Sequence, residues 1–304
     1  MLCKKPVAST MGYWPCGQCL PCRINKRRIW TNRIVLEGLL YQHKTFVTLT
    51  YTEDDLVYGK TTEPILVRKD FQDFMKRLRR RYKLPLRYFA VGEYGKGEGK
   101  EQINGRPHYH IALFNYPNCE HGNSRYSKTR ETCCRNCELI REVWGKGNVF
   151  LGSLERKSAQ YVAGYTTKKM TAESDERLRG RTPEFATMSL KPGIGAEAMA
   201  IVAKTLLHYG VCDDLDDVPK VLRMGKKLMP TGNYLTKRLR KEVGRDTKIP
   251  QAEFEKVYAP VYDVLLAASK SEEVSPLAHI QTRDLQKIRN LEGKEDIFKK
   301  RSVI

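Results

Sequence analysis

The strongest constraint on the fold is the order of three strand-like segments and one helical segment. Residues 45–51, 87–94 and 107–114 are rich in β-branched and aromatic side chains, which favour strands. Between the first two, residues 69–83 place apolar side chains at helical spacing and fill most other positions with lysine and arginine. That pattern predicts an amphipathic helix with a basic outer surface.

Two further elements continue the order. A strand is expected near residues 148–154 and a helix from about 156 to 170. A glycine-rich loop would join the second and third strands, and a Cys/His insertion at about 117–138 would follow the third. This β-α-β-β-insertion-β-α order predicts an α+β fold with an antiparallel sheet backed by helices.

The sequence divides into three segments by composition. Residues 1–40 are Cys-rich and basic, residues 41–170 hold the predicted sheet domain, and residues 171–304 form a basic region with mostly helical patterns. The charged, turn-rich stretch 171–183 is interpreted as a linker.

The charge balance indicates a polyanionic partner. The 304 residues contain 55 Lys+Arg and 35 Asp+Glu, a net charge of +20, which is typical of nucleic-acid or anionic-membrane binding. A membrane is disfavoured because no apolar run approaches the roughly 20 residues that span a bilayer. Residues 1–22 also lack the apolar centre of a signal peptide. We therefore expect an intracellular protein whose nine cysteines are reduced.

One candidate metal site combines two histidines with a glutamate. His108 and His110 alternate on a predicted strand, so both imidazoles project from one face, about 7 Å apart at the backbone. Glu93 ends the preceding strand and offers a carboxylate. Such a site can take Mn²⁺ or Mg²⁺ and keep positions open for a phosphate oxygen. A histidine pair alone is more often two ordinary sheet residues, so the interpretation depends on Glu93.

Two tyrosines form a second constellation. Tyr161 and Tyr165 share one face of the predicted helix, and Lys168 lies one turn beyond Tyr165. The alternative is an aromatic stripe in the core. A phenol has an ordinary pKa of about 10, so a nearby ammonium and a metal-bound phosphate would help it to act as a nucleophile.

The cysteines predict structural zinc. The first group has tight spacing, and Cys3 is a candidate fourth ligand: Cys16, Cys19 and Cys22. The second resembles a zinc knuckle in which Cys133 adjoins the predicted ligands: Cys119, His121, Cys134 and Cys137. The alternative is unpaired surface thiols. Cys212 stands alone and is interpreted as packing.

Together these motifs resemble the HUH-type rolling-circle replication initiators, most closely those of the gokushovirus branch of the Microviridae. The order and spacing carry the resemblance, since each motif alone is common. The matching segments are 15–23, 46–51, 92–95 with 106–110, 161–168, 188–195 and 230–235.

The resemblance implies an HUH/RRM-like fold and a function. A tyrosine attacks the scissile phosphate of single-stranded or origin DNA, leaving a 5′-phosphotyrosine and a 3′-OH for host polymerase and helicase. Tyr165 would be the first nucleophile, Tyr161 the second, and residues 41–170 the endonuclease domain. The expected location is the cytoplasm of a host bacterium.

Two alternatives remain open. A non-catalytic zinc-ribbon DNA-binding regulator would explain the charge and the cysteines, but it leaves the histidines and tyrosines without a role. An HUH transposase or relaxase would use the same chemistry for another purpose. The sequence contains no helicase phosphate loop, which argues against a helicase-fused initiator.

Overall fold

The computed structural model describes residues 3–9, 12–95, 105–123, 133–165, 173–211, 217–253, 255–256 and 275–301. The chain forms two compact units. We call Trp30–Ala198 the sheet unit, and Met1–Ile29 together with Met199–Ile304 the terminal unit.

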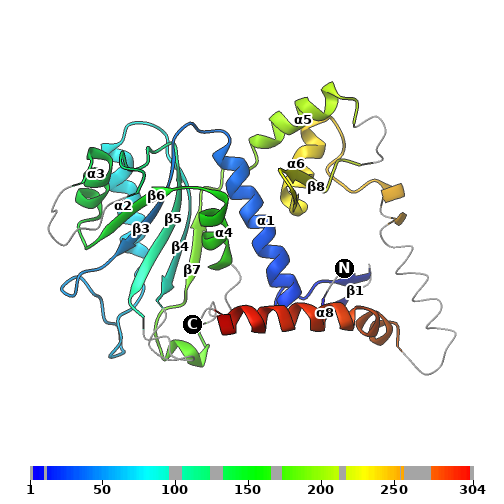
Figure 1. Ribbon diagram of the computed structural model, residues 1–304, viewed down its shortest axis with the longest axis horizontal. Helices are drawn as coiled ribbons and strands as arrows, with labels where there is room; N and C mark the ends of the chain where they lie inside the picture. The colour runs from blue at the N-terminus through cyan, green and yellow to red at the C-terminus, as the bar shows by residue number, and fades with distance from the viewer. Residues whose placement is uncertain are drawn as a thin grey trace. The chain divides into compact units, whose positions relative to one another are not determined.

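The sheet unit is built on a five-stranded antiparallel sheet with the strand order β6-β3-β5-β4-β7 (Figure 1). The strands are β3 Lys44–Thr50, β4 Arg87–Tyr94, β5 Pro107–Phe114, β6 Val149–Ser153 and β7 Phe185–Met188. The predicted α+β fold with an antiparallel sheet and helices is thereby confirmed.

Helices cover both faces of this sheet, which explains why its central strands are apolar almost throughout. In β5, Tyr109, Ile111 and Leu113 belong to one buried cluster, whereas Ala112 and Phe114 belong to another. Because side chains alternate along a strand, the two clusters lie on opposite faces. His108 and His110 therefore lie on the second face, with Ala112.

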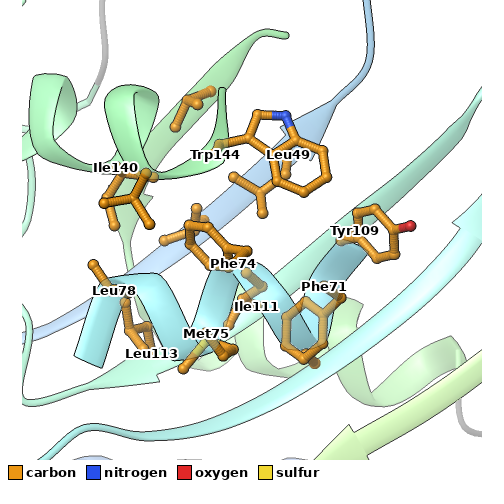
Figure 2. Close-up of a cluster of buried hydrophobic side chains, with 14 of the residues drawn as sticks. Leu49, Phe71, Phe74, Met75, Leu78, Tyr109, Ile111, Leu113, Ile140 and Trp144 are labelled. Atoms are coloured by element: carbon orange, nitrogen blue, oxygen red, sulfur yellow. The ribbon is translucent and has the colours of Figure 1, made fainter. Parts of the chain in front are cut away.

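The first face packs against α2 Arg68–Arg81 and α3 Arg135–Trp144 (Figures 1 and 2). In α2, Phe71, Phe74, Met75 and Leu78 recur at helical spacing and are buried against the sheet, as Figure 2 shows. Burial of each such side chain stabilises the fold by about 1.5–3 kcal/mol. Arg77 donates hydrogen bonds to carbonyls of the last two residues of α3, where a cation is favoured by the helix dipole.

The second face packs against α4 Arg156–Tyr165 and the later part of α1 Leu20–Gly38. Ile34 of α1 and Val162 and Ala163 of α4 are fully buried there. The sequence pattern did not indicate α1, because closely spaced basic residues occupy its first turns. This second face is the one that carries the histidines.

The interpretation of residues 171–183 as a linker is wrong for the described residues 173–183. Leu178 ends a 3-10 helix and is fully buried in the cluster of the first face. Arg181 is also buried, 3.1 Å from Glu63 and over the ring of Tyr94. The segment is charged because its charges are paired inside the unit, and it leads directly into the edge strand β7.

A buried ion pair joins α1 to the loop after β7. Glu37 is fully buried and pairs with Arg87 of β4. Its other carboxylate oxygen accepts a hydrogen bond of 2.6 Å from the backbone N–H of Gly195. Gly195 has a φ of +80°, and a Cβ there would meet the backbone of Arg33 at 3.0 Å. The segment 188–195 thus shapes the sheet unit and contributes no side chain to the histidine face.

The terminal unit is mostly helical in its C-terminal part, as predicted. It contains the hairpin β1 Val7–Ser9 and β2 Gly12–Trp14, the first turns of α1, and a second hairpin, β8 Val221–Met224 and β9 Lys227–Pro230. Its other helices are α5 Ala198–His208, α6 Gly232–Glu242 and α8 Pro276–Arg301. None of the described helices is long and apolar enough to cross a membrane.

Asp217 and Arg240 form a buried bidentate ion pair in the terminal unit. Nε and one Nη of Arg240 lie 2.7 and 2.6 Å from the two carboxylate oxygens. Burial alone would raise the pKa of Asp217, but hydrogen bonds from Arg240 and from the N–H of Val218 outweigh it and lower the pKa. One cation of the basic run 237–241 is therefore structural.

Candidate active site

The register of three strands brings the predicted metal ligands together. Glu93 of β4 lies directly opposite His108 of β5, and His110 lies opposite Val91. Residues opposite each other in an antiparallel pair share one face of the sheet. The three side chains consequently meet on the face that α4 covers.

Both imidazoles point to the same carboxylate oxygen. Nε2 of His108 is 2.8 Å and Nε2 of His110 is 3.0 Å from Oε1 of Glu93. The three ligand atoms all lie within 4.8 Å of one another, and Glu93 and His110 are buried. A buried carboxylate between two imidazoles is a favourable place for a cation, because an unpaired buried charge costs several kcal/mol, a rough estimate.

The other ring nitrogen of His108 is also held. Its Nδ1 is 2.9 Å from the carbonyl oxygen of Arg106. A carbonyl only accepts, so Nδ1 carries the proton and Nε2 of the neutral ring keeps its lone pair toward Glu93. Metal-binding histidines in proteins are commonly fixed in this way. Two imidazoles and one carboxylate fit a divalent ion that retains open coordination positions.

Tyr161 lies beside this group. Its hydroxyl is 3.3 Å from Nε2 of His110, and its side chain is 47% exposed. Tyr165 is the last residue of α4, and its side chain, like Lys168, lies outside the described residues. The structure therefore brings one of the two predicted tyrosines to the histidines.

Two contacts of this site were missed in the sequence. Oγ1 of Thr48 is 2.9 Å from Nδ1 of His110, and the ring of Phe46 stacks on the same imidazole at a centroid distance of 5.5 Å. Both residues belong to β3, the neighbour of β5. Their alternate spacing in a motif that the sequence had already singled out was the available signal.

The N-terminal cysteines form one four-thiol cluster. Cys3 precedes β1, Cys16 follows β2, and Cys19 and Cys22 lie at the start of α1. Backbone N–H groups of Lys4, Cys16 and Cys19 point at three of the sulfurs at 3.3–3.4 Å. Cys3 is thus the fourth member that the spacing left uncertain.

A second four-thiol cluster joins the end of β5 to the start of α3. Its members are Cys119, Cys133, Cys134 and Cys137. His121, which the sequence favoured as a ligand, has an exposed side chain outside the cluster, and only its backbone N–H contacts the sulfur of Cys119. Cys133 lies next to the helix and takes the fourth place. Cys212 lies outside the described residues.

The thiols within each cluster differ in acidity. Burial opposes ionisation of Cys16, but backbone N–H groups of Cys19 and Gln18 prevail and lower its pKa to about 6. Burial raises the pKa of Cys22. Four thiols at this distance can ionise together only when a cation balances them, which fits tetrahedral Zn²⁺ with four sulfur ligands.

Comparison with known proteins relates the chain to phage replication proteins. Residues 44–170 match the family model of the replication-associated protein ORF2. The chain is 32% identical over 171 residues to replication-associated protein VP4 of Bdellovibrio phage phiMH2K, a match covering 54% of this chain and 50% of that one. It is 35% identical over 194 residues to replication-associated protein ORF2 of Spiroplasma virus 4, covering 60% and 55%.

The chain thus spans about half the length of the curated relatives it matches. No solved structure matches it significantly. These relatives confirm the resemblance to the replication proteins of Microviridae-like phages that the sequence motifs indicated.

Proposed function

We propose that this relative of the Microviridae-like replication proteins starts rolling-circle replication by nicking single-stranded origin DNA with a tyrosine. One contact carries the proposal: the hydroxyl of Tyr161 lies 3.3 Å from Nε2 of His110, a candidate metal ligand. The matched segment 44–170 contains both residues. The net charge of +20 suits a polyanionic substrate.

Glu93, His108 and His110 would hold Mn²⁺ or Mg²⁺. A divalent ion there would polarise and orient the scissile phosphate. The half-exposed Tyr161 side chain leaves room for a DNA strand to approach its hydroxyl. Tyr165, one turn later, would be the first nucleophile with Lys168 beside it, and Tyr161 the second, as the sequence motif implies.

The chemical step is a transesterification. The phenol oxygen forms a bond to phosphorus, and the bond from phosphorus to the 3′ oxygen breaks. The phenol loses one proton and the departing 3′ oxygen gains one, so that the products are a 5′-phosphotyrosine and a free 3′-OH. A second phenol could then cleave the regenerated origin, and the free 3′-OH would close the displaced strand. Host polymerase and helicase in the bacterial cytoplasm would extend the nicked strand.

The two cysteine clusters would each hold a structural Zn²⁺. The first would tie the β1–β2 hairpin to the start of α1, and the second would tie the end of β5 to the start of α3. Both connect short segments with few buried contacts, which a metal stabilises efficiently.

The decisive experiment uses single-stranded oligonucleotides that tile the genome encoding this chain. The full chain is incubated with each oligonucleotide and Mn²⁺, with and without EDTA, and covalent adducts are separated under denaturing conditions. We expect an adduct with one sequence that EDTA abolishes. Binding without any adduct across the whole tiling would contradict the proposal.

The same experiment tests a second candidate, a non-catalytic zinc-ribbon DNA-binding regulator. The two four-thiol clusters favour it. It predicts sequence-selective retention of a duplex, no covalent adduct, and no effect of substituting His108 or His110 on binding.

A further inference from the structure

The geometry points to Thr48 as a positioning residue that selects the tautomer of His110, with Phe46 fixing the plane of the ring. This role rests on the proposed function, because it presumes a divalent ion at Glu93, His108 and His110. It gives a purpose to the first sequence motif, residues 46–51, which the proposed chemistry does not use directly.

The placement follows from the register of β3. Thr48 lies directly opposite His110 of β5, so the two side chains project from the same face. Val47, Leu49 and Tyr51 alternate to the other face, where they are buried in the core. The motif is therefore divided: its apolar members build the core and its remaining members face the site.

The hydrogen bond determines which nitrogen of His110 faces the ion. A neutral imidazole has one N–H and one lone pair. Nδ1 is 2.9 Å from Oγ1 of Thr48, while Nε2 is 3.0 Å from the Glu93 carboxylate. When Nδ1 donates to the threonine hydroxyl, Nε2 keeps its lone pair toward the metal position. A β-branched side chain on a strand has restricted χ1, so the hydroxyl stays in place.

Phe46 restrains the same ring from its face. Its ring lies 5.5 Å from that of His110 with an interplanar angle of 17°, and it meets Tyr161 edge-on at 6.2 Å. Rotation of the imidazole about χ2 would break both the stacking and the hydrogen bond to Thr48. The stack also places the phenol of Tyr161 against the imidazole edge, since these two rings are 5.0 Å apart at 80°.

Two substitutions separate positioning from packing. Thr48→Val keeps the shape and removes the hydroxyl, whereas Thr48→Ser keeps the hydroxyl and removes a methyl group. If Thr48 positions His110, Thr48→Val lowers Mn²⁺ affinity roughly 10-fold or more, the usual effect of losing such a supporting contact. Thr48→Ser retains the affinity. Simple packing predicts the reverse order.

The measurement is a titration with Mn²⁺ followed by electron paramagnetic resonance of the free ion. Binding that persists in His108→Ala is subtracted as belonging elsewhere, and thermal unfolding shows that each variant is folded. Thr50→Val is the matched control, because its hydroxyl lies on the same strand face but contacts the carbonyl of Asn148 at 3.3 Å. We expect its Mn²⁺ affinity to equal that of the wild type.

Adduct formation is measured in parallel. We expect Thr48→Val to need more Mn²⁺ for half-maximal rate while its rate at saturating Mn²⁺ stays within a few-fold of the wild type. Unchanged Mn²⁺ affinity in Thr48→Val overturns the positioning role and leaves the nickase proposal standing. Weakened affinity in a protein that forms no adduct in any variant supports the positioning role and overturns the nickase proposal.

Discussion

The phenol oxygen of Tyr161 lies 3.3 Å from Nε2 of His110, across the interface between α4 and the central strand β5. The strand supplies two candidate metal ligands, and the helix supplies a candidate nucleophile. Since both elements belong to one buried cluster of the sheet unit, the site is built on packed, regular structure.

Replacing either histidine should abolish nicking without abolishing DNA binding. Binding depends on many lysine and arginine contacts to phosphates, whereas the imidazoles act on one phosphate. We expect His108→Ala and His110→Ala to form no adduct while their affinity for the single strand, measured by fluorescence anisotropy, changes less than about three-fold. His43→Ala is the control, because His43 is exposed and precedes β3 at the opposite end of the strand from Thr50. Wild-type adduct yield in either site variant would exclude this metal site.

The two tyrosines should divide the reaction between them. One nick needs one phenol, but ending a round needs a second attack while the first phenol is still esterified to DNA. We expect Tyr165→Phe to reduce nicking strongly and Tyr161→Phe to nick yet release few closed circles. The double variant should form no adduct.

Peptide mass spectrometry of the phosphotyrosine tests this assignment. An adduct on Tyr161 alone would reverse the two roles, which the contact of Tyr161 with His110 makes chemically reasonable. An adduct on neither tyrosine would end the proposed mechanism.

Elemental analysis should find two zinc ions per chain, one for each four-thiol cluster. Cys133→Ser should lose about one of them, because Cys133 is a member of the second cluster. His121→Ala is the matched variant and should keep both, since its side chain lies outside the cluster. Loss of zinc in His121→Ala but not in Cys133→Ser would restore the ligand set that the spacing suggested. A folded, reduced protein without zinc would leave both clusters without a ligand.

Breaking the buried pair of Asp217 and Arg240 should destabilise the terminal unit. Arg240→Met leaves a buried carboxylate unpaired, which typically costs about 3–5 kcal/mol. Arg238→Met in the same helix is the control, because its pair with Glu242 is partly exposed and contributes under about 1 kcal/mol. Urea unfolding measures both free energies.

The effect should depend on pH in one direction. The pKa of Asp217 is lowered in the folded state, so its contribution is present above the unfolded pKa of about 3.9 and is lost as the pH falls through the folded pKa. The difference between wild type and Arg240→Met should therefore be constant near neutral pH and shrink below about pH 4. A difference that grows on acidification would contradict this account.

Much of the sheet unit was predictable, because its signals are local. Alternation places His108 and His110 on one face whatever the strand pairs with, and helical spacing gives α2 its buried side. The order of strands also indicated that Glu93 would be near His108, since the two strands follow each other along the chain. These features depend on periods of two and 3.6 residues, which a sequence displays directly.

Other features required long-range packing. Leu178 and Arg181 sit in a charged stretch whose burial becomes visible only when Glu63 and Tyr94 are placed around it. The choice of Cys133 over His121 depends on how the chain enters α3, because both lie within reach of Cys119 in sequence.

The sequence by itself determined which residues could do chemistry: two alternating histidines, a glutamate at the end of a strand, a tyrosine pair and eight clustered cysteines. Only the tertiary structure decided that Thr48 and Phe46 hold His110 and that Tyr161 meets it. Residue type and local period are written in neighbouring positions. The register of β3 against β5 and the docking of α4 come instead from burying apolar side chains that lie 50 or more residues apart, as Phe46 and Ala112 do.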